Sequence, residues 1–226
     1  MRYILGFLTL SLAVVAVFSR EAIFNAAIDA NLSWTFSSLL TWVIVLLLSI
    51  FAVFALRFIL KGKWAKILFT FLLPLALLGL MFAVNPIYVG DYVKKGEALN
   101  IENHVLLDIV EDYKSDFDGI VAVVDYNCPF CRIATKERLT KINLRKTDID
   151  MVLTLNTSDL EKIEGYAAST KSKSLHYLQH KPEADIVELI KGAFPSFVYI
   201  KNGKILHKWR NSELGFPALD WIEGGL

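Results

Sequence analysis

Residues 119–131 carry the sequence Gly-Ile-Val-Ala-Val-Val-Asp-Tyr-Asn-Cys-Pro-Phe-Cys. Its first part is apolar and rich in β-branched residues, which predicts a strand over residues 120–126 that is buried on both faces. The residues that follow, Arg132 to Asn143, predict a helix. A cysteine where a strand gives way to a helix lies among unpaired backbone N–H groups, which favour the thiolate. The order strand, Cys-x-x-Cys, helix therefore predicts a reactive cysteine pair.

The two cysteines, which are the whole cysteine content of the chain, are expected to have different roles. Cys128, at the helix N-terminus, is predicted to be the exposed nucleophile, with positive potential added by Arg132. Cys131, one turn further on, is predicted to resolve the mixed disulfide. A metal half-site and a structural disulfide are the alternatives. A tetrahedral zinc site needs four ligands, and there is no second cysteine pair, so we expect no metal and no other cofactor.

Three other polar residues, one acid and two histidines, have two interpretations each. Asp125 is either a proton shuttle for the cysteines or an acid that simply ends the strand. His176 and His180 are spaced four residues apart and would share one face of a helix. Because no zinc-protease motif contains them, we expect solvated or capping histidines rather than metal ligands.

Three apolar segments without a charge fill the first third of the chain: Tyr3–Phe18, Ala30–Leu56 and Ile67–Gly90. A helix needs about 20 apolar residues to cross a bilayer, and the second and third segments exceed this length. The first segment is shorter and is flanked by arginines, so a cleaved signal peptide is its alternative. We predict a membrane domain of three transmembrane helices over residues 1–88.

The charges between these segments predict the orientation of the chain. The loop between the second and third segments holds Arg57, Lys61, Lys63 and Lys66 and no acid, so it is expected to be cytoplasmic. The N-terminus would then be cytoplasmic as well, and residues 89–226 would form an extracytoplasmic domain. Tyr88 would lie near the outer interface. In a bacterium this means the cytoplasmic (inner) membrane, with the domain in the oxidising periplasm or its equivalent.

The domain after residue 88 shows alternating helix and strand signals. Residues 85–104 are expected to be a linker with an irregular lead-in, and residues 166–182 carry no clear signal. Strand, helix and strand over 120–156 form a βαβ unit, which requires parallel pairing. The other expected elements are a helix over 105–113, a strand over 150–156, a helix capped by Ser158 with Glu161, a helix over 183–191, a strand over 194–200, an Asn202-Gly203 hairpin, a strand over 204–210 and a helix over 216–222.

Across about residues 100–223 this order resembles the thioredoxin superfamily. Two motifs carry the resemblance: the strand ending in Cys128-Pro129-Phe130-Cys131 before a helix, and Phe194-Pro195 leading into a strand, an Asn-Gly hairpin and a second strand. The resemblance implies an α/β fold with a central mixed sheet flanked by helices. It also implies that Pro195 is cis and packs against the cysteines. Phe194 would then offer its backbone to a substrate chain, with Pro129 and Phe130 beside it.

Within that superfamily the membrane-anchored extracytoplasmic branch is most similar in plan, including bacterial proteins that join a DoxX-like helical bundle to a thioredoxin-like domain. Two departures bear on the chemistry. The Pro-Phe dipeptide between the cysteines resembles the oxidising branch rather than the Gly-Pro of reducing thioredoxins. Ala122 stands where thioredoxins carry a buried acid, six residues before Cys128, and the nearest acid is Asp125.

Together these observations predict an enzyme, a membrane-tethered thiol–disulfide oxidoreductase that exchanges disulfides with extracytoplasmic proteins. The direction of the exchange stays open. A separate redox partner must recycle the dithiol, because the chain holds no further cysteine. A module that binds copper through two thiolates and a structural membrane subunit with a vestigial redox domain are the alternatives. The charges form no concentrated basic patch, so we expect no nucleic-acid partner.

Overall fold

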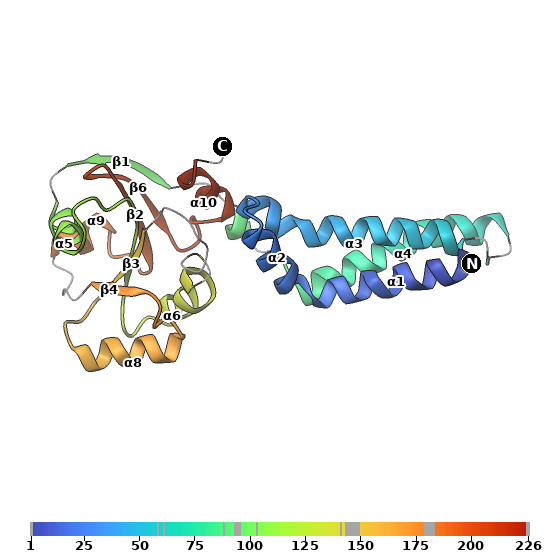
Figure 1. The fold of residues 1–226 in the computed structure, drawn as a ribbon, viewed down its shortest axis with the longest axis horizontal. Helices are drawn as coiled ribbons and strands as arrows, with labels where there is room; N and C mark the ends of the chain where they lie inside the picture. The colour runs from blue at the N-terminus through green and yellow to red at the C-terminus, as the bar shows by residue number, and fades with distance from the viewer. Residues whose placement is uncertain are drawn as a thin grey trace. The chain divides into compact units, whose positions relative to one another are not determined.

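The structure is a computed structural model, and it describes residues 2–57, 59–60, 62–87, 89–92, 96–102, 104–140, 142, 150–178 and 184–224. The chain forms two compact units, Met1–Val89 and Gly90–Leu226, each of which is described by itself (Figure 1). Lys61 and Tyr88, used above to predict orientation, and His180 lie outside the described residues.

The N-terminal unit consists of helices α1 (Arg2–Phe18), α2 (Arg20–Asp29), α3 (Trp34–Leu56) and α4 (Lys63–Val84). Helices α3 and α4 are long and apolar enough to cross a membrane. Helices α1 and α2 meet that test only as a pair, and the pair is bent by 78°. The described residues therefore contain two or three candidate spans, and three remains a prediction.

Helix α1 packs against α3 through small and apolar side chains. A Cβ added at Gly6 would lie 2.7 Å from the Leu56 side chain, so the absence of a side chain at Gly6 allows this close approach. Asn85 closes the other end by donating from Nδ2 to the Val17 carbonyl oxygen at 2.9 Å. The outer faces remain apolar, with Ile4 75% and Phe71 71% exposed. Apolar outer faces are expected of helices that lie in lipid.

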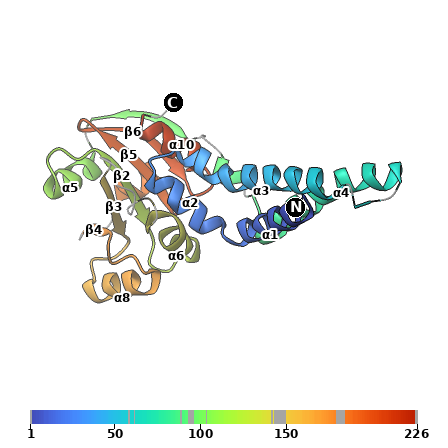
Figure 2. The same ribbon diagram turned by 45° about the vertical axis from the view of Figure 1, so that its right-hand side comes forward.

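The C-terminal unit is built on a six-stranded sheet of order β1-β6-β5-β2-β3-β4 (Figures 1 and 2). Strands β2, β3 and β4 are parallel to one another, whereas β5 pairs antiparallel with β2 and β6 antiparallel with β5 and β1. The sheet is mixed, with β5 and β6 joined by a hairpin, as the sequence implied. The strands are β1 (Glu97–Ile101), β2 (Gly119–Val124), β3 (Asp150–Leu155), β4 (His176–Leu178), β5 (Ser196–Lys201) and β6 (Lys204–Arg210).

Helices cover both faces of the sheet. Helices α5 and α9 lie on one side (Figure 1), and α6 and α10 lie on the other (Figures 1 and 2). Every residue of β2 is buried, because alternate side chains face the two layers. Val121 and Val123 join the core beneath α5 and α9. The helices are η1 (Val89–Tyr92), α5 (Val105–Tyr113), α6 (Pro129–Ala134), the π-helical turn η2 (Thr135–Leu139), α8 (Leu160–Thr170), α9 (Ala184–Leu189) and α10 (Phe216–Ile222).

Several local predictions need correction. Residues 97–101, expected to lie in a linker, form the edge strand β1. The cap of α8 is Asp159, not Ser158, because the Asp159 carboxylate accepts hydrogen bonds from the backbone N–H groups of Glu161 and Lys162. His176 lies in strand β4 and not on a helix. Its ring stacks on Tyr113 with centroids 4.1 Å apart.

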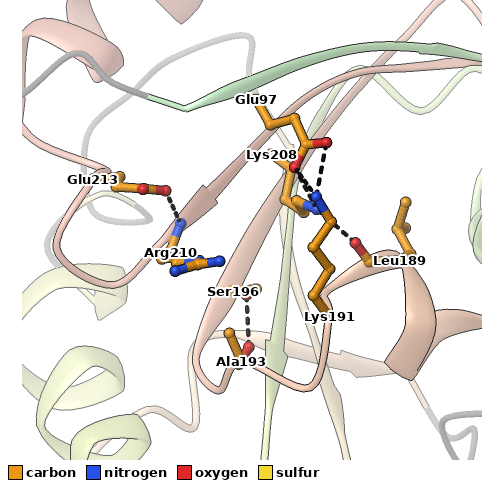
Figure 3. A network of polar contacts seen from close by, with 8 residues as sticks. All are labelled: Glu97, Leu189, Lys191, Ala193, Ser196, Lys208, Arg210 and Glu213. Carbon is orange, nitrogen blue, oxygen red and sulfur yellow. Dashed lines mark hydrogen bonds and ion pairs between the residues drawn. The ribbon is translucent and has the colours of Figure 1, made fainter.

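A polar network joins the edge strand to the rest of the sheet (Figure 3). Lys208 on β6 is 5% exposed. Its Nζ donates to the Leu189 carbonyl oxygen at 2.7 Å and lies 3.0 Å from Glu97 Oε2 on β1. Lys191 Nζ also lies 3.0 Å from Glu97 Oε2. Hydrogen bonds from these two lysines lower the pKa of Glu97 from 4.5 to about 2.

This lowered pKa predicts a pH dependence of stability. A carboxyl group with a depressed pKa stabilises the fold fully above its unfolded pKa and loses that contribution as the pH falls toward its folded pKa. We therefore expect Glu97→Gln to lower the urea-unfolding midpoint of the full chain in detergent at pH 7. The difference from the parent chain should shrink between pH 4.5 and about 2. Glu102→Gln is the matched control, because the Glu102 carboxylate pairs with Lys204, which is more exposed than Lys208. Its urea-unfolding midpoint should fall less than that of Glu97→Gln. A difference that stays constant to pH 2 would contradict this assignment.

Candidate functional site

Strand β2 places the two cysteines at one end of the sheet. It lies between β3 and β5, so both of its edges are hydrogen-bonded and its end is fixed. A turn follows, in which Cys128 N–H donates to the Asp125 carbonyl oxygen at 3.2 Å. Helix α6 then begins at Pro129, a residue suited to a first helical position because its missing N–H needs no partner there.

Cys128 is the N-cap residue of α6 and is partly exposed. Its Sγ accepts a hydrogen bond from the Cys131 backbone N–H at 3.2 Å. A hydrogen bond of this kind from the first helical turn stabilises negative charge on a sulfur atom. On its other side, the Cys128 thiol lies 3.8 Å from the Phe194 carbonyl oxygen and donates to it.

Cys131 lies behind Cys128 and is completely buried. Its Sγ accepts a hydrogen bond from the Asp125 backbone N–H at 3.4 Å. Burial, together with the hydrogen bond to Cys128, raises the pKa of the Cys131 thiol well above its usual range. Both cysteines are free thiols in the structure.

This difference in burial predicts selective alkylation. When the reduced full-length chain is treated with iodoacetamide at pH 8, we expect one equivalent to react, at Cys128. Cys131 is expected to react only after denaturation, because it is buried and keeps its proton. Peptide mapping by mass spectrometry checks this. Equal labelling of both thiols in the native chain would contradict the assignment of roles.

The Phe194–Pro195 peptide bond is cis, as the resemblance implied. Pro195 is buried, and Phe194 is partly exposed beside Cys128. Ser196 Oγ donates to the Ala193 carbonyl oxygen at 2.6 Å and closes the turn that carries this dipeptide (Figure 3). The structure thus brings together two segments that lie 66 residues apart in the chain.

An apolar surface lies beside the exposed sulfur. Pro129 is exposed, Phe130 is 64% exposed and Ile133, one turn further along, is 59% exposed. Ile133 was not singled out from the sequence, although its spacing from Phe130 on a helix places it on the same face. Exposed apolar side chains next to a reactive group are suited to contact with a partner chain.

Arg132 contacts two tyrosine rings and a serine hydroxyl, and its expected contribution of positive potential at Cys128 stays a prediction. Its guanidinium lies over the rings of Tyr126 and Tyr166, at 5.2 and 5.3 Å from their centroids. It also donates to Ser169 Oγ at 2.9 Å. These contacts tie α6 to α8.

Asp125 is fixed by two hydrogen bonds at the end of β2. Its Oδ1 accepts from the Asn127 backbone N–H and its Oδ2 from Asn156 Nδ2, both at 2.8 Å. Asn156 was missed in the sequence. Val124 pairs with Leu155 in the parallel register. The next residues of the two strands, Asp125 and Asn156, are therefore neighbours, and this position is the signal that could have identified Asn156.

His104 and His207, like His176, have structural contacts. His104 caps α5, and its Nδ1 accepts from the Leu106 backbone N–H at 3.1 Å. His207 stacks on Trp209 with centroids 4.2 Å apart, and burial lowers its pKa. Among the described residues, no group of three or more His, Cys, Asp or Glu side chains is arranged to hold a metal ion.

Comparisons with known proteins give one distant likeness. No protein-family model and no curated protein matches the chain. A solved structure of a secreted disulfide oxidoreductase from Mycobacterium tuberculosis, described as homologous to E. coli DsbE, is 13% identical with a TM-score of 0.36. The match covers 49% of this chain and 83% of that one. A likeness of this size does not assign a function.

Proposed function

We propose that this chain is a membrane-tethered thiol–disulfide oxidoreductase that acts on extracytoplasmic proteins through the dithiol of Cys128 and Cys131. One observation carries the proposal. The partly exposed Cys128 sulfur caps a helix 3.2 Å from the Cys131 N–H, with the fully buried Cys131 thiol behind it. One accessible sulfur and one protected sulfur is the arrangement needed for attack followed by resolution.

In the reducing direction, the Cys128 thiolate attacks one sulfur of a substrate disulfide. A mixed disulfide forms and the first substrate thiolate leaves. Cys131 then loses its proton and attacks Cys128 Sγ, which releases the second substrate thiolate and leaves a Cys128–Cys131 disulfide. Two electrons pass from the protein to the substrate. The oxidising direction is the reverse, and in either case a separate redox partner must restore the dithiol, since the chain has no other cysteine.

The surroundings of Cys128 support an extended polypeptide as substrate. The Phe194 backbone beside the sulfur would pair with the substrate main chain, next to Pro195. The exposed side chains of Pro129 and Phe130 would contact apolar groups on either side of the substrate cysteine. Asp125 would act as the proton shuttle through its carboxylate, and the hydrogen bond from its backbone N–H to Cys131 Sγ places this residue next to the buried thiol.

The proposal includes the location of the two units. Residues 1–88 would anchor the protein in a bacterial inner membrane with the N-terminus cytoplasmic, and residues 89–226 would lie outside. The length and apolar character of α3 and α4 support the anchor. The cations between the second and third apolar segments, including Arg57 and Lys63, support the orientation.

The reduction potential of the Cys128–Cys131 pair tests the function and sets its direction. It would be measured on the full chain in detergent, by equilibration with glutathione or dithiothreitol buffers. A value near about −120 mV would assign disulfide formation, and a value near or below about −250 mV would assign reduction. Copper retained stoichiometrically after purification, with no exchange of disulfides, would instead favour a metal-binding module.

A further inference from the structure

The resolving step requires a base that β2 itself does not provide. Cys131 must lose its proton before it attacks, and it is completely buried. Ala122 and its neighbours Val121 and Val123 are fully buried apolar residues, so the strand offers no carboxylate beneath the cysteines. The first acid along the chain is Asp125, directly after the strand ends.

The backbone of Asp125 contacts Cys131, and two hydrogen bonds fix the orientation of its carboxylate. Its backbone N–H donates to Cys131 Sγ at 3.4 Å. Its carboxylate is held at both oxygen atoms, at Oδ1 by the Asn127 N–H and at Oδ2 by Asn156 Nδ2. Both donors, the Asn127 backbone N–H and the Asn156 amide, are uncharged. Neither of them forms a salt bridge with the carboxylate.

Asn156 is itself fixed by the sheet. It follows β3, and its backbone N–H donates to the Val124 carbonyl oxygen at 3.0 Å, which extends the pairing with β2. Its side-chain amide therefore reaches Asp125 from a rigid element, whereas the other donor belongs to the turn that contains the cysteines. A group held from a strand keeps its orientation when the turn moves.

We infer that Asn156 is a positioning residue for the resolving step, and that its amide holds the Asp125 carboxylate where it accepts the Cys131 proton. The inference rests on the proposed function. The Cys131 proton passes to the Asp125 carboxylate, and the Cys131 sulfur bonds to Cys128 Sγ. The bond between Cys128 and the substrate breaks, and the substrate sulfur leaves with its electron pair. Asp125 then returns its proton to water.

The electrostatics of the site agree with this geometry. Burial and the hydrogen bond to Cys128 are the main causes that raise the pKa of Cys131, the Asp125 backbone hydrogen bond lowers it, and the negative charge of Asp125 raises it. From α8, Tyr166 also interacts with Cys131. Arg132 of α6 is engaged by Ser169 and two tyrosine rings.

The test separates the two chemical steps. Reduced full-length chain in detergent is mixed with a peptide disulfide, quenched in acid at intervals and analysed by mass spectrometry from pH 5 to pH 9. For Asn156→Ala we expect the mixed disulfide to form at the parent rate and to resolve about tenfold more slowly, with the pH profile of resolution displaced. Asn100→Ala, an exposed asparagine on β1, is the matched control and should resolve like the parent chain.

A double variant distinguishes positioning from a general structural effect. If Asn156 acts through Asp125, the double variant Asp125→Ala/Asn156→Ala should resolve no more slowly than Asp125→Ala alone. Additive losses, an unchanged pH profile in Asn156→Ala, or equal slowing of both steps would each overturn the inference while leaving the proposed function intact. No reduction of the peptide disulfide by the parent chain would overturn the proposed function itself.

Discussion

Replacing Cys128 with serine is expected to lower disulfide exchange by the full-length chain by at least about 10³-fold, because the variant loses its partly exposed cysteine and keeps only the buried Cys131. A serine hydroxyl at the same helix N-cap keeps the local hydrogen bonds but does not form a disulfide. The measurement is the rate at which the purified chain in detergent reduces, or in its oxidised form oxidises, a fluorogenic peptide.

Cys131→Ser is the matched variant. It is expected to stop the exchange after the first step, whereas Cys128→Ser prevents that step. Attack by Cys128 remains, but resolution does not, so the mixed disulfide should accumulate and be visible as a mass increase that dithiothreitol removes. If the Cys128 variant turned over dithiol substrates normally, the function proposed here would be wrong. If both serine variants behaved like the parent in the cell, a structural membrane subunit would be favoured.

Gly119→Ala is expected to have the largest effect on stability, about 3 kcal/mol or more. Gly119 begins β2 and lies between Asp150 of β3 and Ile200 of β5. A Cβ added there would lie 2.0 Å from the Asp150 carbonyl oxygen and 2.6 Å from its carbon. These are backbone atoms of a paired strand, so the clash is relieved only by separating β2 from β3. Separation would also displace the end of the strand that carries the cysteines.

Gly165→Ala provides the matched control for this substitution. Gly165 lies inside α8, where an added Cβ meets nothing within 4 Å. Alanine favours a helix over glycine, so stability should rise by about 0.5–1 kcal/mol. Urea unfolding followed by tryptophan fluorescence, with both variants in the same detergent, gives the two differences. Equal stability of Gly119→Ala and the parent chain would contradict the strand pairing described above.

The elements that were predicted with correct bounds have strong local signals. Helix α5 begins and ends at Val105 and Tyr113 as its apolar spacing indicated, and α10 spans Phe216–Ile222. The hairpin between β5 and β6 follows from Asn202-Gly203, whose positive φ angles suit a tight turn. The burial of β2 followed from its unbroken apolar run.

The elements that were missed depend on contacts distant in sequence. Strand β1 has a short, weak pattern and forms because β6 offers it an edge. Its approach depends on Gly96, where an added Cβ would lie 2.3 Å from the His207 ring and 2.5 Å from that of Trp209. The cap of α8 was misplaced because Ser158 and Asp159 are both good caps and only the three-dimensional path of the chain selects one.

The candidate site was only partly predictable for the same reason. Cys128 and Cys131 are neighbours in sequence, so the spacing alone placed them together. The position of Phe194 beside Cys128 came from a family resemblance, since nothing local connects the two segments. The contact between Asp125 and Asn156 required the register of two parallel strands, which the sequence indicates only once both strand ends are known.

The complete burial of Cys131 has a kinetic consequence. Under the proposed function, a substrate and a recycling partner would both react at the partly exposed Cys128 sulfur, so both would dock on the same face and neither would bind while the other is present. Turnover would then follow a ping-pong scheme, in which the protein alternates between two covalent states and never holds both partners at once. An excess of either partner would compete with the other for the single docking face and slow the cycle.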